Sequence, residues 1–157
     1  IVRPHPGPDD LDRLRQVLRA AERPIMVLGG GVWSAKAVDD IRQFIEAFDL
    51  PTAVSFRCQD LIDNTHPNYI GDLGTGVNPL LVQRVKQADV LLVVGARLGE
   101  MTTQGYSLLE IPRPKQALLH IHADAEFRQS QQFQRIPAYP ILANGKSMGS
   151  RLIGGQA

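Results

Sequence analysis

Several loops of this chain carry glycines or charged side chains directly after short apolar runs, and these residue types are suited to binding a phosphorylated ligand. The first such loop, residues 29–34, contains Gly29, Gly30 and Gly31 and ends at Ser34. Glycines allow the backbone to approach a phosphate, and a helix start offers free N–H groups and a positive dipole end. The pattern is similar to a dinucleotide-binding fingerprint with serine in place of its third glycine. A glycine-rich turn without any ligand explains the same residues equally well.

Two further loops have comparable chemistry. Residues 71–76 again place glycines, including Gly74, with Thr75 before a predicted helix, although a plain turn would use the same residues. Residues 95–100 follow the clearest apolar run and contain Gly95 and Arg97. A guanidinium can place a permanent charge on a pyrophosphate or stack on a flat ring. The alternative for Arg97 is a salt bridge to Glu100 or to a neighbouring domain.

A fourth loop follows the apolar run at residues 117–121. Asp124 can bind ribose hydroxyls there, or it can cap the helix that follows. His120 and His122 alternate along a predicted strand, so both are expected to face one side of the sheet. Two histidines could ligate a metal, but no convincing third ligand is evident, and no metal site is predicted. We interpret His120 as a hydrogen-bonded interior histidine.

The elements that must position these loops alternate along the chain. Runs of apolar residues without polar alternation predict strands at 25–28, 52–55, 69–71, 90–94, 117–121 and 139–142, because strands buried on both faces have this pattern. Amphipathic spacing predicts helices at 11–22, 34–49, 78–88 and from 144 onward, with Asp9 or Asp10, Ser34, Asn78 and Asn144 as caps. A short helical turn is expected at 60–63. This order predicts an α/β fold with a six-stranded parallel sheet, doubly wound in three α/β/α layers and Rossmann-like.

Composition limits the classes of function. The 157 residues carry a formal net charge of +1, which gives no sign of a nucleic-acid or membrane partner. No apolar run approaches the length of a membrane span, and the single cysteine, Cys58, fits a reducing, cytoplasmic setting. The prolines near the start indicate a linker at 1–10, followed by one domain at 11–153 and a tail at 154–157. This is the organisation of a piece excised from a longer protein, although a trimmed complete protein is the alternative.

Common catalytic motifs are not found. The sequence has no Gly-x-Ser-x-Gly elbow and no phosphate loop with Gly-Lys-Ser/Thr in frame. Cys58 has no Cys-x-x-Cys partner, and Trp33 is expected to fill space between a helix and the sheet. No catalytic residue is therefore predicted.

Four ordered segments resemble the central domain of thiamine-diphosphate-dependent enzymes of the acetolactate synthase-like family. They are an apolar strand ending in three glycines, a His-Pro segment with an aromatic residue and glycines, an Ala-Asp strand ending in Gly-x-Arg, and a His-Ile-x-x-Asp segment, at residues 23–31, 66–74, 88–98 and 120–126. The resemblance implies a parent enzyme whose flanking pyrimidine-binding and diphosphate-binding domains hold thiamine diphosphate and magnesium. It also implies a homodimeric or homotetrameric parent, because the thiamine site of such enzymes lies between subunits.

The resemblance further implies that this domain is not catalytic and acts as a structural bridge, with FAD or ADP as its ligand in some members. It places a nucleotide site on Gly30, Gly31, Gly74, Thr75, Gly95, Arg97 and Asp124. Two departures disfavour FAD: His122 replaces the first acid of the Asp-x-Asp pattern, and Gly99-Glu100-Met101 replaces the Asp-Asp-Arg type of continuation. Two alternatives remain: a free-standing Rossmann-type NAD(P)-linked oxidoreductase, in which Arg57 would favour a 2′-phosphate, and an interaction domain that binds no small molecule.

Overall fold

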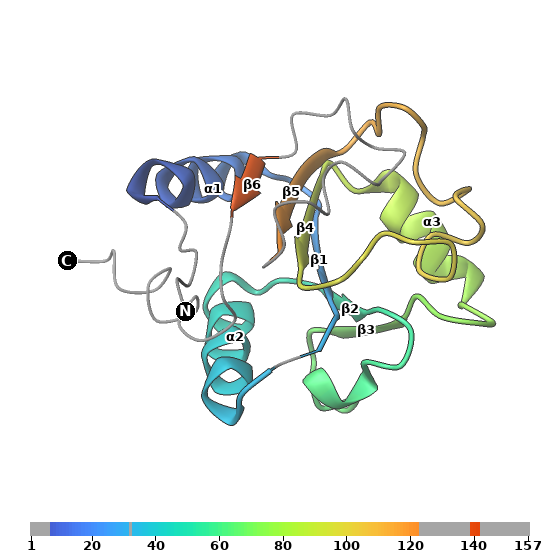
Figure 1. Ribbon diagram of the computed structural model, residues 1–157, viewed down its shortest axis with the longest axis horizontal. Helices are drawn as coiled ribbons and strands as arrows, with labels where there is room; N and C mark the ends of the chain where they lie inside the picture. The colour runs from blue at the N-terminus through green and yellow to red at the C-terminus, as the bar shows by residue number, and fades with distance from the viewer. Residues whose placement is uncertain (1–6, 32, 123–138, 142–157) are drawn as a thin grey trace.

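The computed structural model describes residues 7–31 and 33–122 and the backbone of 139–141. Its elements follow one another in the order α1 (Pro8–Ala20), β1 (Pro24–Leu28), α2 (Ala35–Phe48), β2 (Thr52–Val54), η1 (Gln59–Leu61), β3 (Tyr69–Asp72), α3 (Pro79–Gln87), β4 (Val90–Val94), β5 (Ala117–Ile121) and β6 (Tyr139–Ile141) (Figure 1). Strands and helices alternate through most of this part of the chain, as the apolar runs predict.

The strands form one parallel sheet with the order β3-β2-β1-β4-β5-β6. The chain leaves β1 towards β2 and β3, and then crosses back so that β4 pairs with the other edge of β1. The strand order therefore reverses between β1 and β4, and in open parallel sheets ligands bind at the carboxyl ends of the strands beside such a reversal. The prediction of a parallel α/β fold is confirmed.

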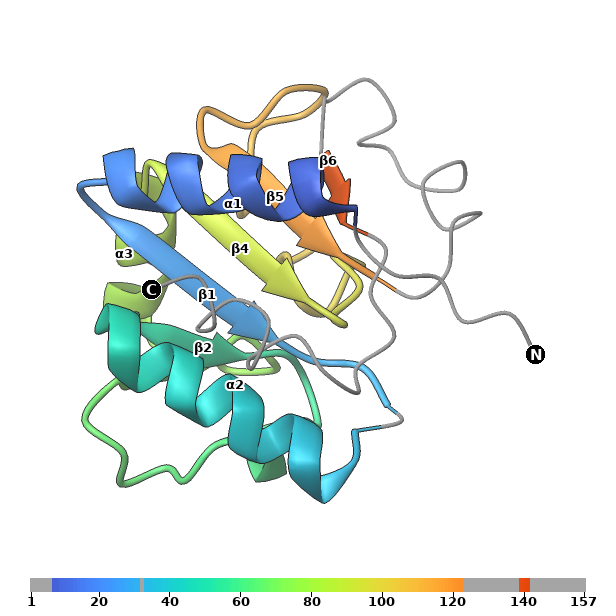
Figure 2. The same cartoon turned by 90° about the vertical axis from the view of Figure 1, so that its left-hand side faces the viewer.

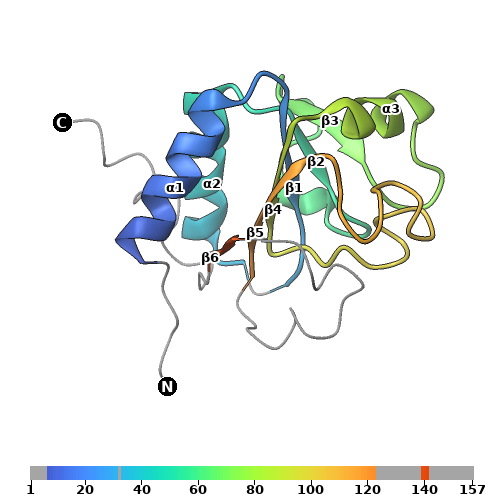
Figure 3. The same ribbon diagram turned by 90° about the horizontal axis from the view of Figure 1, so that it is seen from above.

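Helices cover both faces of the sheet, and alternate strand residues supply two separate cores. Figures 2 and 3 show α1 and α2 on one face and α3 on the other. Met26 and Leu28 of β1 belong to the first core, whereas Ile25 and Val27 belong to the second. Because successive side chains of a strand point to opposite faces, an unbroken apolar run is what such a strand requires.

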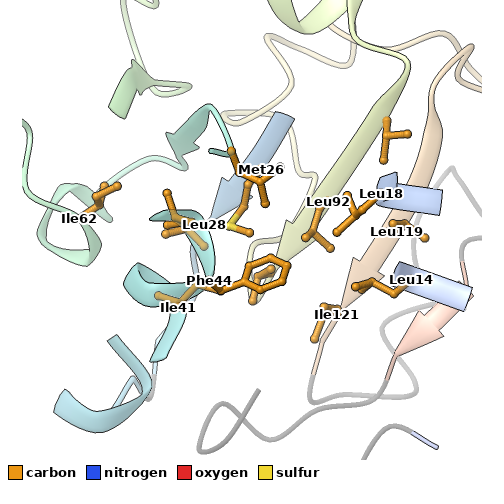
Figure 4. Packing of buried hydrophobic residues seen from close by; sticks show 14 of the residues in the cluster. Leu14, Leu18, Met26, Leu28, Ile41, Phe44, Ile62, Leu92, Leu119 and Ile121 are labelled. Atoms are coloured by element: carbon orange, nitrogen blue, oxygen red, sulfur yellow. The ribbon is translucent and has the colours of Figure 1, made fainter. Parts of the chain in front are cut away.

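The larger core lies between β1, β4, β5 and the two helices α1 and α2. Phe44 of α2 is fully buried, and Figure 4 shows it among residues of β1, β4 and α1. Leu14 of α1 is likewise 0% exposed, and Figure 4 shows it beside Leu119 and Ile121 of β5. Truncating a buried residue of this size to alanine typically costs about 2–5 kcal/mol. This packing holds the carboxyl ends of β1 and β4 in a fixed relation.

Two helix starts agree with the caps read from the sequence. The Ser34 hydroxyl accepts a hydrogen bond from the Ala37 N–H at 3.2 Å, and the Asn78 side chain accepts one from the Leu80 N–H at 2.9 Å. The start of α1 was predicted wrongly at residue 11. The helix begins at Pro8 after Gly7, because proline suits the first helical position, and Asp10 accepts the Gly7 N–H at 3.1 Å instead of serving as the cap itself.

Smaller boundary corrections concern strand and helix ends. β2 ends at Val54 and not at residue 55, because the chain turns at Ser55, whose carbonyl accepts the Cys58 N–H at 3.1 Å. The short helical turn occupies Gln59–Leu61 and not 60–63. The predicted helix from residue 144 and the tail at 154–157 lie outside the described residues. None of the helices in the described part of the chain is long and apolar enough to span a membrane.

Candidate functional site at the carboxyl edge of the sheet

The loops that follow β1 and β4 cross in close contact at the carboxyl edge. A Cβ atom at Gly30 would lie 2.3 Å from the carbonyl oxygen of Gly95, and one at Gly95 would lie 2.5 Å from the carbonyl oxygen of Gly29. Both Gly30 (φ 77°) and Gly95 (φ 71°) have left-handed backbone conformations, which glycine adopts without steric cost. Two of the predicted site residues are thus brought together, and the backbone crossing itself explains why each is glycine.

Gly29 allows a second close approach, from β2. A Cβ atom at Gly29 would lie 2.0 Å from the Ser55 hydroxyl and 2.7 Å from the Ala96 Cβ. Ser55 is 5% exposed, so its hydroxyl lies almost buried above the end of β1. Ser55 is not among the predicted site residues. Its only sequence signal is its place directly after a predicted strand.

Gly31 differs from its two neighbours. A Cβ atom there would meet nothing within 4 Å, its φ is not positive, and the residue is exposed. No atom of the described residues therefore requires glycine at this position, and Gly31 is exposed at this edge. Trp33 does not extend into this space. Its indole N–H donates to the Gly29 carbonyl at 3.0 Å and its ring packs on the first core, as predicted.

The loop after β3 joins the same edge through Phe56. A Cβ atom at Gly74 would lie 2.9 Å from both the Phe56 ring and an Asp72 carboxylate oxygen. Asp72 accepts the Gly74 N–H at 2.6 Å and is also hydrogen-bonded by the Gln59 side-chain amide. Gly74 is therefore buried in a turn closed by Asp72, and its neighbours are not Gly30 or Gly95. Its glycine is explained by this turn.

The remaining predicted residues are placed as follows. Thr75 is exposed between Gly74 and the start of α3. Arg97 is exposed two residues after Gly95, at the switch point of the sheet. Asp124 lies outside the described residues. The loops after β1 and β4 thus form the centre of the candidate site, with Arg97 beside them.

His120 of β5 is hydrogen-bonded to the loop after β4. Its Nε2 atom lies 2.9 Å from the Ala96 carbonyl oxygen, which requires that nitrogen to carry the proton. Burial lowers the pKa of His120 to about 4, and the charge of His122, whose ring centroid lies 5.8 Å away, acts in the same direction. The ring is therefore neutral at pH 7. The interpretation of His120 as a hydrogen-bonded interior residue is confirmed.

Asp89 performs a structural role that sequence reasoning missed. Its carboxylate accepts the backbone N–H groups of Glu22 at 2.6 Å and Arg23 at 3.0 Å, which lie just before β1. Its own carbonyl accepts the Ala117 N–H at 2.8 Å. Burial acts to raise the pKa of Asp89, but the backbone hydrogen bonds, with those from Glu22 and Arg23 foremost, outweigh it and lower the pKa. Asp89 thereby ties the starts of β1, β4 and β5 together at the edge opposite the candidate site.

Within the described ranges, no group of three or more His, Cys, Asp or Glu side chains could hold a metal ion. The chemistry that this edge offers is instead that of anion recognition: accessible backbone at Gly31, the almost buried hydroxyl of Ser55 and the cation of Arg97. Such a set suits phosphate groups, which backbone N–H groups and guanidinium groups bind well.

Comparison with known proteins identifies the relatives of this chain. The family model for the central domain of thiamine pyrophosphate enzymes matches residues 11–147. The chain is 33% identical to a sulfoacetaldehyde acetyltransferase of Rhodobacter capsulatus over 109 residues, or 69% of this chain and 18% of that protein. It is 29% identical to the acetolactate synthase isozyme 2 large subunit of Escherichia coli over 124 residues, or 78% of this chain and 22% of that protein.

A third relative covers more of the chain. The 3D-(3,5/4)-trihydroxycyclohexane-1,2-dione hydrolase of Geobacillus thermodenitrificans is 32% identical over 147 residues, or 94% of this chain and 22% of that protein. The chain spans about a fifth of the length of these curated relatives. The match leaves a free-standing NAD(P)-linked oxidoreductase without support, and it confirms the resemblance seen in the four sequence segments. This chain belongs to the family of thiamine pyrophosphate enzyme central domains.

Proposed function

We propose that this chain is the non-catalytic central domain of a longer thiamine-diphosphate-dependent carboligase or decarboxylase, acetolactate synthase-like, and that it carries an adenine-nucleotide site at its carboxyl edge. It would bridge a pyrimidine-binding domain and a diphosphate-binding domain of the same chain, which together would hold thiamine diphosphate and magnesium. The longer enzyme would be a cytoplasmic homodimer or homotetramer. The family match over residues 11–147 and the small share of each relative that the chain covers support it.

The observation that carries the nucleotide site is the contrast between Gly31 and its neighbours. Gly29 and Gly30 are glycines because protein atoms occupy the space of their side chains, whereas Gly31 faces open space at the switch point. Backbone exposed in this place is what the phosphates of ADP or FAD require. Arg97, exposed in the adjacent loop, supplies a permanent positive charge for the diphosphate.

Calorimetric titration of the chain with ADP and with FAD tests this proposal. We expect saturable binding of at least one of them, weakened about tenfold or more by Arg97→Ala, since a lost charge-assisted hydrogen bond is worth about 1.5–3 kcal/mol. Arg84→Ala is the control, because Arg84 is an exposed arginine in the last turn of α3 and should leave affinity unchanged. Binding of FAD would indicate an acetolactate-synthase-like parent, and binding of ADP alone would indicate an acyl-CoA decarboxylase. If neither nucleotide bound, the domain would be a bridge only and the proposed site would be wrong.

A further inference from the structure

Arg57 lies at the carboxyl end of β2, next to the glycine loop after β1. Leu28 and Val54, the last residues of the two strands, are paired in the sheet, and the Ser55 N–H donates to the Leu28 carbonyl at 2.8 Å. Beyond Arg57, the Cys58 Sγ lies 3.9 Å from the Gly30 carbonyl oxygen. The segment that contains Arg57 is therefore fixed against the β1 loop on both sides of this residue.

The backbone of Arg57 has a conformation that arginine rarely adopts. Its φ is 62°, in the left-handed region, within a turn in which the Cys58 N–H donates to the Ser55 carbonyl at 3.1 Å. Glycine or asparagine usually provides a positive φ in such a turn, and another residue there costs on the order of 1 kcal/mol or more. Nonglycine residues in this region cluster at ligand sites. The conformation of Arg57 is thus of the kind found at ligand sites, and its side chain is a candidate ligand contact.

That side chain has no acidic partner in the part of the chain that the structure describes. The guanidinium carbon lies 5.1 Å from the centroid of the Phe56 ring, and the residue is exposed. A cation–π contact leaves the hydrogen-bond donors at the edge of the guanidinium available, because it uses only the flat face. Arg57 therefore presents a permanent, oriented positive charge at this edge.

In nucleotide-binding parallel sheets, the residue at the carboxyl end of the second strand has a known role. When a glycine loop after the first strand holds the diphosphate of a nucleotide, the residue that ends the second strand faces the ribose. An acid there binds the two ribose hydroxyls, whereas an arginine accommodates a phosphate on the ribose. The residues after β2 are Ser55, Phe56 and Arg57, with no acid among them.

We propose that Arg57 determines the specificity of the carboxyl-edge site for adenine nucleotides that carry a phosphomonoester on the ribose. This inference rests on the proposed nucleotide site, in which Gly31 and Arg97 would receive the 5′-diphosphate while Arg57 binds the additional phosphate. The same chemistry would serve a 2′-phosphate or a 3′-phosphate, and the titration distinguishes these two sources. It also disfavours FAD, whose adenosine ribose carries no phosphate on its 2′- or 3′-hydroxyl.

The test compares adenosine 5′-monophosphate with adenosine 2′,5′-diphosphate and adenosine 3′,5′-diphosphate, each of which is the monophosphate with one additional phosphate on the ribose, by calorimetric titration of the chain. We expect one of the two ribose-phosphorylated compounds to bind at least tenfold more tightly than the 5′-monophosphate, which corresponds to about 1.4 kcal/mol. Arg57→Gln should abolish this preference, and Arg57→Lys should retain part of it. Arg57→Asn serves as a second variant, because asparagine tolerates the left-handed conformation and keeps the fold intact while it removes the charge.

Three outcomes would overturn the inference. If adenosine 5′-monophosphate bound and ribose phosphorylation gave no gain, the specificity assigned to Arg57 would be wrong while the nucleotide site would stand. If Arg57→Gln and Arg57→Asn kept the full preference, a residue other than Arg57 would bind the ribose phosphate. Failure of all three compounds to bind would instead contradict the nucleotide site itself, together with this inference.

Discussion

Gly95 occupies the space that a side chain at Gly30 would need, since a Cβ atom at Gly30 would lie 2.3 Å from the Gly95 carbonyl oxygen. The two residues lie in the loops that follow neighbouring strands, β1 and β4, between which the strand order reverses. Their contact brings the two loops into one surface at the carboxyl edge. The contact is made by backbone, so it depends on glycine and not on any particular side chain.

Replacing Gly30 and replacing Gly31 should change the free energy of unfolding by very different amounts. Gly30→Ala places a methyl group against the Gly95 carbonyl and forces alanine to φ 77°, so we expect a loss of about 1–3 kcal/mol in the free energy of unfolding. Gly31→Ala meets nothing within 4 Å and should change it by less than about 0.5 kcal/mol. Urea denaturation of both variants measures the difference. Equal effects would show that the crossing is not as tight as the structure has it.

Removal of the Asp89 carboxylate should destabilise the opposite edge. Asp89→Ala leaves the N–H groups of Glu22 and Arg23 without their acceptor, at a cost of about 1–3 kcal/mol. Asp39→Ala is the matched control. Asp39 makes only an exposed ion pair with Arg42, at 3.3 Å, which is worth about 1 kcal/mol or less. Similar losses in the two variants, measured by chemical denaturation, would contradict the tying role of Asp89.

Acidification should reduce the contribution of the Asp89 carboxylate to the free energy of unfolding. The pKa of Asp89 is lower in the folded chain than its ordinary value of 3.8, so the unfolded chain takes up the proton first. The stability that Asp89 contributes is therefore complete above about pH 4 and is lost as the pH falls further. Asp89→Asn should remove this part of the acid dependence. Unfolding curves of the chain and the variant between pH 5 and pH 2, as a rough range, would show it.

His120 should give a second, separate pH dependence. Its pKa is lowered from 6.5 to about 4, so the folded chain holds the ring neutral and protonation favours unfolding. The free energy of unfolding should be highest above pH 6.5 and should fall, by roughly 3 kcal/mol at most, as the pH drops to about 4. His120→Gln can keep a donor to the Ala96 carbonyl but does not titrate, and should flatten the curve in this window. An unchanged curve in the variant would mean that another group is responsible.

The local elements were predictable because their signals lie within a few residues. The apolar runs of β4 and β5 mark both strands with their observed limits, and the cap residues Ser34 and Asn78 form hydrogen bonds to residues two or three positions away. The start of α1 was missed by three residues because two acids beside a proline offer several caps. Only the actual geometry shows that Pro8 takes the first helical position.

Contacts between distant segments were less predictable. The sequence shows glycines at 29–31 and 95, but not that Gly30 lies against Gly95 while a Cβ atom at Gly31 would meet no described atom within 4 Å. Asp89 belongs to a motif of the family, yet its partners, Glu22 and Arg23, lie more than 60 residues away, and no local pattern links them. Ser55 was missed because its burial arises from the close approach of β1, which the sequence does not record.

Calorimetric titration of the chain and of Gly31→Ala with adenosine 5′-diphosphate is the most direct test of the nucleotide site. If the open backbone at Gly31 receives the nucleotide phosphates, the chain should bind adenosine 5′-diphosphate. Gly31→Ala, with its stability unchanged, should bind at least about tenfold more weakly, because its methyl group would fill the open space that the phosphates need. Binding of equal strength in both proteins would contradict the placement of the phosphates at Gly31. No binding in either would contradict the nucleotide site and leave the domain as a structural bridge.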